Sequence, residues 1–411
     1  MSLQTALTGL TVAQTGIDTT SNNLANANTT AYKSQTALFE SIFPQEGSTN
    51  TTPGMGAEVE GISTDLTQGS LNQTGDSLDA AVQGNGYFVV ASNGIQQYTR
   101  DGAFQLSSTG QIETLNGDMV QGYPTVNGAL SGALGAITVN TGSVGGTATS
   151  NAGLSMSLRS GDQIVNSAFD PSNASTYNET TSVVAYDSAG NANRVQLYMV
   201  HTAADSWQVY AVPQTPNGQP VTSGAQTTPA PTLLTTLTFS TSGGLTGGNS
   251  PEPTLSNINW DNGSAASTIS FNFNGTTSMA QSFSVGASSN NGSAPGSYAG
   301  VAIGSDGSVN ATYTNGQTIS VGKIALANFV NPGGLTPLSG NLYAANGNSG
   351  TPTISQPGAG QAGTLAGGEL EVSNVSTSNM LVSLIQYQQA YQANTSVIQT
   401  EQQDSQRLLQ I

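Results

Sequence analysis

The sequence predicts a multi-domain protein. Two terminal α-helices form a coiled-coil-like core domain, and two mainly antiparallel β domains, barrel-like or sandwich-like, are each nested as an insertion in the previous one. Apolar residues recur at helical spacing at both ends, whereas the residues between them form short β-type runs separated by turn signals. A length of 411 residues is sufficient for two or three domains. We expect a helical core from residues 1–74 and 365–411, a first β domain from 75–145 and 296–364, and an outer β domain from 146–295.

The N-terminal helix is predicted from a heptad-like repeat. Leu3, Leu10, Ile17 and Leu24 are spaced by seven residues, so they lie on one face of a helix that we expect to end at about Ala27. An Asn-rich segment follows, and Asn side chains compete for backbone hydrogen-bonding groups, which favours a helix end there.

The C-terminal helix is predicted where the composition changes. Glycine and proline do not occur after Gly368, and Leu381, Leu384, Tyr391 and Ile398 follow at spacings of three and seven residues. We expect this helix to span about 375–410, with Gln, Asn, Ser and Thr on its opposite face.

Neither helix is expected to be stable alone. We call the eight apolar residues of these two repeats the anchors. Burying one anchor stabilises the folded protein by about 1.5–3 kcal/mol, but only when another apolar surface covers the side chain. Two packed helices bury only the side chains along their shared face. Apolar side chains on the other faces would be exposed to water in a monomer; these are Leu7, Val382, Ile385 and Leu408. We therefore predict that other copies of the chain cover them, with the eight anchors forming the subunit interface. An ordinary intramolecular coiled coil is the alternative.

Composition excludes several classes of function. The chain has 6 basic and 23 acidic residues and a net charge of −17, which argues against nucleic acid and anionic membrane surfaces as partners. It has no cysteine, and no apolar run is long enough for membrane insertion. The first basic residue is Lys33 and the N-terminal segment is amphipathic, unlike a secretory signal, so we expect any export route to retain the N-terminus.

The middle of the chain is β-type. The run from Ala80 to Val90 leads into an Asn93-Gly94 turn and a return strand at Ile95–Thr99, which predicts a hairpin. In the outer domain we expect strands at Val183–Tyr186, Arg194–Val200, Trp207–Val212 and Ile269–Phe273. Residues Gln35–Thr74 are expected to be extended and irregular.

Catalytic and metal chemistry find little support, and we predict no catalytic, cofactor-binding or metal-binding residue. The single histidine, His201, has no second histidine or cysteine to share a metal with. The stretch Gly358–Gly363 matches G-x-G-x-x-G but follows Pro357 and precedes no evident helix. The carboxylates Asp76/Asp79 and Glu369/Glu371 are interpreted as turn and cap residues rather than a glycosidase pair.

Several motifs resemble the bacterial flagellar rod, hook and basal-body protein family. The first is Asn22-Asn23-Leu24-Ala25-Asn26 followed by Tyr32-Lys33, although the family usually has Gly where this chain has Ala31. Others are Gly84–Phe88, Tyr98–Phe104, Gln121–Tyr123, Gly367–Val375 and Tyr391-Gln392-Ala393-Asn394. The resemblance covers about residues 1–145 and 296–411.

The resemblance implies a structural protein rather than an enzyme. Within this family, the large inserted domain favours a hook subunit that assembles into the curved tube between rod and filament. It further implies export through the flagellar type III apparatus to the outside of the cell, and contacts with rod, hook-cap and hook–filament junction proteins. The alternatives are a distal rod protein and an extracellular β-rich protein or enzyme that binds polysaccharide.

Overall fold

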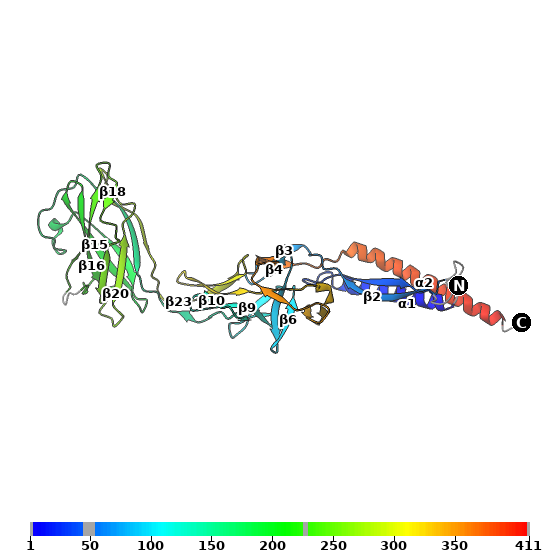
Figure 1. The fold of residues 1–411 in the computed structure, drawn as a ribbon. Helices are drawn as coiled ribbons and strands as arrows, with labels where there is room; N and C mark the ends of the chain where they lie inside the picture. Colours follow the sequence, from blue (N-terminus) through cyan, green and yellow to red (C-terminus); the bar gives the residue numbers. More distant parts are fainter. Residues whose placement is uncertain (1–2, 44–53, 225–228, 409–411) are drawn as a thin grey trace. The chain divides into compact units, whose positions relative to one another are not determined.

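The computed structural model describes residues 3–43, 54–224 and 229–408, which divide into two compact units (Figure 1). Unit 1 comprises Met1–Val139, Gly300–Ala311 and Ile319–Ile411, and unit 2 comprises Asn140–Ala299 and Thr312–Thr318. Each unit is assembled from separate segments of the chain, in agreement with the predicted nesting of one domain in another. The further predicted boundaries within unit 1 stay a prediction.

The predicted terminal helices are confirmed. Helix α1 spans Leu3–Ala25 and α2 spans Thr377–Leu408. Helix α1 ends two residues before the predicted Ala27, where the Asn26 side chain bonds back to Asn22 O at 2.9 Å. The remainder of the predicted C-terminal helix, beyond Leu408, lies outside the described residues.

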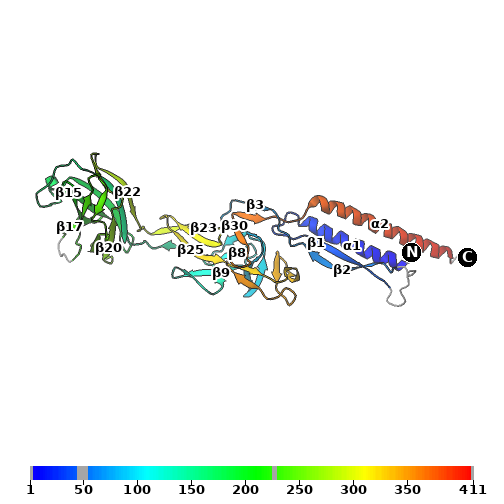
Figure 2. The same cartoon turned by 45° about the horizontal axis from the view of Figure 1, so that its top comes forward.

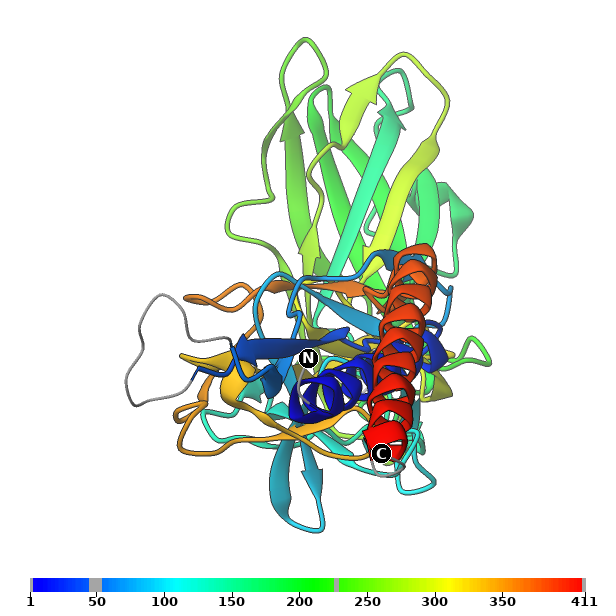
Figure 3. The same cartoon turned by 90° about the vertical axis from the view of Figure 1, so that its right-hand side faces the viewer.

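The two helices pair antiparallel along a seam of small residues (Figures 2 and 3, α1 in blue and α2 in red). Contacts recur at seven-residue steps in opposite directions: Gly9 with Asn394, Gly16 with Tyr387 and Asn23 with Met380. A β-carbon built on Gly16 would lie 2.6 Å from ring atoms of Tyr387, so only glycine permits this approach. The buried residues of α1 are Ala6, Ala13, Gly16, Thr19, Thr20 and Asn23.

A β-hairpin covers part of the helix pair. Strands β1 (Gln35–Ser41) and β2 (Ala57–Thr64) are antiparallel, and Phe39 packs edge-on against Tyr387 with ring centroids 6.3 Å apart. The prediction that Gln35–Thr74 is irregular was therefore wrong for these residues. Alternation of charged and apolar residues in Ala57–Thr64 fits a strand with one face toward a partner.

The rest of unit 1 is mainly antiparallel sheet, in which β25, β9, β5 and β6 are successive neighbours. The predicted hairpin is confirmed as β5 and β6, with Asn93 and Gly94 at φ values of 50° and 81° in the turn. The strands are β3 (Leu71–Gln73), β4 (Ala80–Gln83), β5 (Tyr87–Ser92), β6 (Ile95–Thr99), β7 (Phe104–Leu106), β8 (Ile112–Thr114), β9 (Met119–Val126), β10 (Ala129–Leu130), β11 (Gly135–Ala136), β25 (Thr318–Ile324), β26 (Leu326–Asn328), β27 (Thr336–Pro337), β28 (Leu342–Ala344), β29 (Thr353–Ser355), β30 (Thr364–Gly367) and β31 (Glu369–Glu371). The boundaries between unit 1 and unit 2 fall within strands β23 (Gly296–Ile303) and β24 (Ser308–Tyr313).

Unit 2 is a β-sandwich. One sheet has the order β14-β15-β16-β17-β18, the other the order β19-β20-β13-β21 with β22 added to β13. Inward side chains of both sheets form one core, which includes Trp207, Leu197 and Phe271. The strands of the two sheets are β13 (Asn151–Arg159), β14 (Glu179–Tyr186), β15 (Ala192–Ala203), β16 (Ser206–Gln214), β17 (Thr232–Phe239), β18 (Leu245–Gly247), β19 (Thr254–Ile258), β20 (Ser267–Asn272), β21 (Thr277–Met279) and β22 (Ser284–Asn290), whereas β12 (Ser143–Val144) pairs with β23. These overlap all four strands predicted for the outer domain.

Substituting Gly16→Val tests the close helix approach. The added side chain would collide with the Tyr387 ring, so we expect α1 and α2 to separate and unit 1 to lose about 1–3 kcal/mol of unfolding free energy, as in other overpacked cores. Urea unfolding followed by circular dichroism measures the loss. Gly61→Val, at a site where a β-carbon meets no atom within 4 Å, is the control, and equal stability of both variants would contradict the seam.

Candidate functional site

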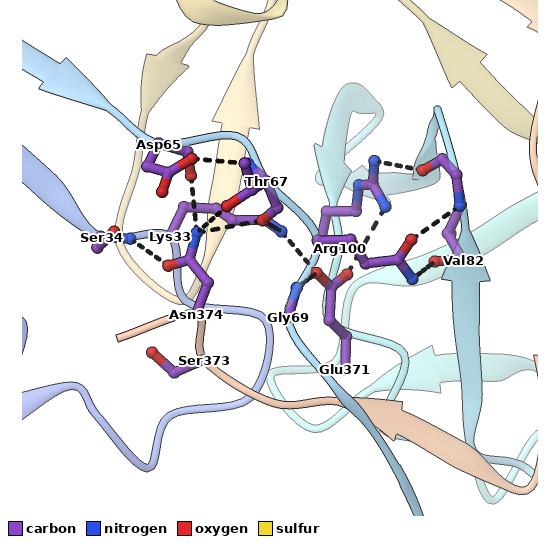
Figure 4. Close-up of polar contacts among 12 residues, drawn as sticks. Lys33, Ser34, Asp65, Thr67, Gly69, Val82, Arg100, Glu371, Ser373 and Asn374 are labelled. Atoms are coloured by element: carbon purple, nitrogen blue, oxygen red, sulfur yellow. Dashed lines mark hydrogen bonds and ion pairs between the residues drawn. The ribbon is translucent and has the colours of Figure 1, made fainter. Parts of the chain in front are cut away.

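The terminal segments meet in a buried polar cluster in unit 1. We call Lys33, Arg100, Glu371 and Asn374 the polar clasp (Figure 4). Lys33 follows α1, Arg100 follows β6, and Glu371 and Asn374 lie between β30 and α2. The clasp therefore connects chain segments that are more than 300 residues apart, since Lys33 and Glu371 are separated by 338 positions.

Glu371 is the centre of the clasp, and its side chain is inaccessible to solvent. Lys33 Nζ donates to Glu371 Oε1 at 2.5 Å and to the Thr67 carbonyl at 2.8 Å. The Gly69 N–H donates to the same Glu371 oxygen at 2.9 Å. Burial lowers the pKa of Lys33, and the hydrogen bond and charge of Glu371 oppose that effect.

Asn374 adds a second connection beside the ion pair. Its Oδ1 accepts from the Ser34 N–H at 2.7 Å, while its Nδ2 donates to the carbonyls of Asp65 and Thr67 at 3.0 and 3.1 Å. The Ala31 N–H donates to the Glu371 carbonyl at 2.8 Å. Residues that follow α1, residues that follow β2 and residues that precede α2 are thus tied together by both side chains and backbone.

Three of the seven N-terminal motif residues, Asn23, Tyr32 and Lys33, make hydrogen bonds in this junction. Asn23 is buried; its Oδ1 accepts from the Gln35 N–H and from Tyr32 Oη, and its Nδ2 donates to the Gln35 carbonyl at 2.6 Å. Asn22 bonds with Asn26, whereas Leu24 is half-buried and Ala25 exposed. Ala31 is left-handed, with φ at 58°, a conformation that favours glycine.

The C-terminal motif lies on α2. Asn394 faces Gly9, Tyr391 is half-buried, and Gln392 and Ala393 are exposed. This motif therefore contributes to the seam through Asn394, its last residue.

The predicted interface anchors lie beside the seam rather than in its centre. Leu3 and Leu381 are exposed by 51% and 48%, and the others are half-buried: Leu10, Ile17, Leu24, Leu384, Tyr391 and Ile398. Three further apolar side chains are more than half exposed, Leu7, Val382 and Ile385. The side chain of Leu408 lies outside the described set. Whether neighbouring copies cover these residues stays a prediction.

The residues weighed for catalysis occupy structural positions. Glu371, one member of the Glu369/Glu371 pair, forms an ion pair with Lys33 in the clasp. Residues 358–363 form turns that lead into strand β30 rather than into a helix. His201 is buried and stacks on Trp207, with ring centroids 4.6 Å apart.

Within the described ranges, no group of three or more His, Asp or Glu residues is placed to hold a metal ion. Neither α1 nor α2, over the residues described, combines the length and the apolar character needed to cross a bilayer.

Sequence reasoning missed Arg100 and Glu371 as clasp residues. One signal was available: basic residues are scarce in this chain, and two of the six, Lys33 and Arg100, lie in the clasp. It also interpreted Glu371 as a turn or cap residue, since nothing in a single sequence pairs a glutamate with a lysine 338 positions away.

Family models match most of the chain. Residues 3–33 match the flagella basal body rod protein family, and residues 81–153 match the flagellar hook protein FlgE/F/G D1 domain. Residues 157–293 match the flagellar basal body protein FlaE D2 domain, and residues 366–411 match the flagellar basal body rod FlgEFG protein C-terminal region.

Relatives extend over nearly the whole length. The flagellar hook protein FlgE of Salmonella typhimurium is 35% identical over 98% of this chain and 98% of its own length. FlgE of Escherichia coli is 34% identical with the same coverage, and FlgE of Rhizobium meliloti is 32% identical over 97% and 95%. The crystal structure of Helicobacter pylori flagellar hook protein FlgE2 matches 73% of this chain and 99% of its own with a TM-score of 0.51; at 14% identity this likeness concerns the fold.

A double-mutant cycle on Lys33 and Glu371 tests the clasp. Lys33→Met removes the closest partner of the buried Glu371 and leaves it only Arg100, at 3.6 Å, whereas Glu371→Gln leaves Lys33 and Arg100 without a carboxylate; each should cost about 3–5 kcal/mol of unfolding free energy. The double variant should cost clearly less than the sum, because each single change already removes the contact between the two side chains. Denaturant unfolding supplies the four free energies; strictly additive losses would mean that the two groups do not interact.

Proposed function

The chain belongs to the flagellar hook protein family, and from this premise we propose that it is the structural subunit of a bacterial flagellar hook. Copies of the chain assemble into the curved, flexible tube that joins the rod to the filament. The terminal helices form the inner part of the tube, and the β units lie outside them.

The observation that carries this proposal is the apolar surface of the helix pair. Leu3, Leu7, Leu381, Val382 and Ile385 are each about half exposed or more. A monomeric protein rarely presents so many large apolar side chains along one element pair, whereas a subunit interface buries them. The polar clasp then fixes the helix pair relative to the strands that follow it within unit 1.

The surroundings of the assembled hook follow from this role. We propose that the protein is delivered by the flagellar type III export apparatus and functions outside the cell. Its ends in the polymer contact rod proteins on one side and hook-cap or hook–filament junction proteins on the other. An enzymatic role is not part of the proposal: Glu371 is paired with Lys33, and His201 stacks on Trp207.

Substituting Leu381→Asp tests the assembly role of the helices. Leu381 is 48% exposed, so the monomer should keep its fold, whereas a carboxylate buried between copies would block polymerisation. Electron microscopy and sedimentation of concentrated protein measure assembly, and circular dichroism measures folding. Leu381→Met is the matched control and should form tubes. Normal tubes from the Asp variant would contradict the assignment.

Deleting residues 146–295 tests whether unit 2 is needed for the tube itself. The ends of this segment are adjacent, since the Thr147 N–H donates to Ser293 O at 3.0 Å and the Ser293 N–H to Thr147 O at 2.9 Å. A short Gly-Ser connection should therefore close the gap, and we expect tubes with altered curvature in electron micrographs. Loss of all assembly, with unit 1 still folded, would show that unit 2 is essential.

A further inference from the structure

We propose that a polar pocket in unit 2 binds a sugar ring, the uncharged polyhydroxyl unit of carbohydrates. This role goes beyond the proposed hook function and does not depend on assembly, because the pocket lies within a single chain. Three observations support it: the lining of the pocket, the hydrogen bonds that hold its side chains, and the accessible groups that those bonds leave free.

The pocket has a volume of about 400 Å³. Small-molecule sites usually measure about 300–1,000 Å³. Its walls come from β18, the segment between β18 and β19, and the end of β20 with the turn that follows. Leu245 packs against the sandwich core and offers an apolar surface for the C–H groups of a ring. The lining residues are Leu245, Thr246, Gly247, Asn249, Ser250, Glu252, Asn272 and Asn274.

A chain of hydrogen bonds holds the polar side chains in place. Asn249 Oδ1 accepts from the Phe273 N–H at 2.7 Å, and Asn249 Nδ2 donates to Asn274 Oδ1 at 2.9 Å. The Asn274 N–H donates to Asn272 Oδ1 at 2.9 Å, and Asn272 Nδ2 donates to Glu252 Oε1 at 2.6 Å. Because Phe273 is buried in the sandwich core, this chain of bonds fixes the site before a ligand arrives, which reduces the entropy lost on binding.

The same bonds leave donors and acceptors free at the pocket surface. Within the described residues, Glu252 Oε2, Asn274 Nδ2 and Ser250 Oγ make no hydrogen bond. All three residues are exposed, so an entering ligand reaches these groups directly. A hydroxyl group both donates and accepts, so neighbouring sugar hydroxyls can donate to the carboxylate and accept from the amide. The bond to the carboxylate is charge-assisted and therefore stronger than a neutral one.

The lining selects against other classes of ligand. Among the lining residues that the structure describes, Glu252 is the one charged group, so phosphates and carboxylates are repelled. The side-chain oxygens of the three asparagines each already accept an N–H, and the part of the chain that is described holds no group of three His, Asp or Glu suited to a metal ion. An ammonium group would meet the free N–H donors of Asn274, whereas an uncharged ring with hydroxyls uses both kinds of group.

Ligand-observed NMR on the full chain, kept below its assembly concentration, tests the site. The probes are the methyl glycosides of glucose, galactose, mannose and N-acetylglucosamine, with dextran as the polysaccharide. We expect saturation transfer to at least one glycoside with a Kd on the order of 1 mM, because the exposed groups exchange water for ligand. Dextran binding more tightly than the glucoside would assign the pocket to a polysaccharide, and glycoside binding alone would assign it to single sugars. No transfer to any probe overturns the proposal.

Three variants connect binding to the pocket. Glu252→Gln keeps an acceptor for Asn272 but removes the charge, so we expect glycoside binding to weaken about tenfold or more. Thr246→Tyr adds a ring at the exposed wall of the pocket and should abolish binding without touching the chain of hydrogen bonds. Asp205→Asn, an equal charge change at an exposed position of unit 2 outside the lining, is the control. Binding that is the same in all three variants overturns the proposal.

Two further probes decide the class of ligand. A stronger response to ethylammonium than to any glycoside would mean that the Glu252 carboxylate attracts cations on its own. An equal response to glycerol would mean that the pocket holds small polar molecules without selecting a ring. Either result overturns the sugar assignment. Because these measurements use the single chain, failure of tube formation would contradict the proposed function and leave this inference untouched.

Discussion

The buried contact between Lys33 and Glu371 is the constraint on which unit 1 depends. A lysine that follows α1 and a glutamate that precedes α2 are both removed from water, and neither charge is tolerable there without the other. Ion pairs of this kind add little net stability compared with apolar packing, but they are strict about geometry. The pair therefore selects a single arrangement in which the segment that follows the end of α1 lies beside the segment that precedes the start of α2. Asn374 and Asn23 reinforce that arrangement through bonds to backbone groups.

The helix pair departs from an ordinary coiled coil in a way that bears on assembly. At Gly9 and Gly16 there is no room for a β-carbon, so the α1 backbone packs directly on the side chains of Asn394 and Tyr387. The leucines and isoleucines of the heptad-like repeat are displaced to the flanks, where they are exposed or half-buried. One set of residues holds the monomer's helices together, and another set remains available for contacts between copies.

Much of this architecture could be predicted from periodicity. The seven-residue repeats predicted both helices, with both ends of α1 and the start of α2 within two residues, and the Asn93-Gly94 turn predicted the β5–β6 hairpin. The hairpin of β1 and β2 could not be predicted in the same way. Its strands pack on α1 and are joined through a segment with Pro44 and Pro53, so tertiary contacts rather than a local turn signal define it.

The clasp could not be predicted from a single sequence, for a related reason. Lys33 and Tyr32 were noted as motif residues, but a motif does not reveal what a side chain touches. Arg100 and Glu371 meet Lys33 only because three distant segments converge, and no spacing rule connects them. Likewise, heptad spacing identified Leu10 and Ile17 as anchors but could not show that the neighbouring Gly16 packs directly on the Tyr387 ring.

Thr147 and Ser293 form an isolated antiparallel bridge that has a consequence for the segment between them. Because the backbones of these two residues are hydrogen-bonded to each other, residues 148–292 form a loop whose ends are already held together. Lengthening, shortening or replacing that loop therefore has little effect on the conformational entropy that the remainder of the chain loses on folding. The length of the β-rich segment between Thr147 and Ser293 can therefore change without altering how the clasp closes the ends of the chain.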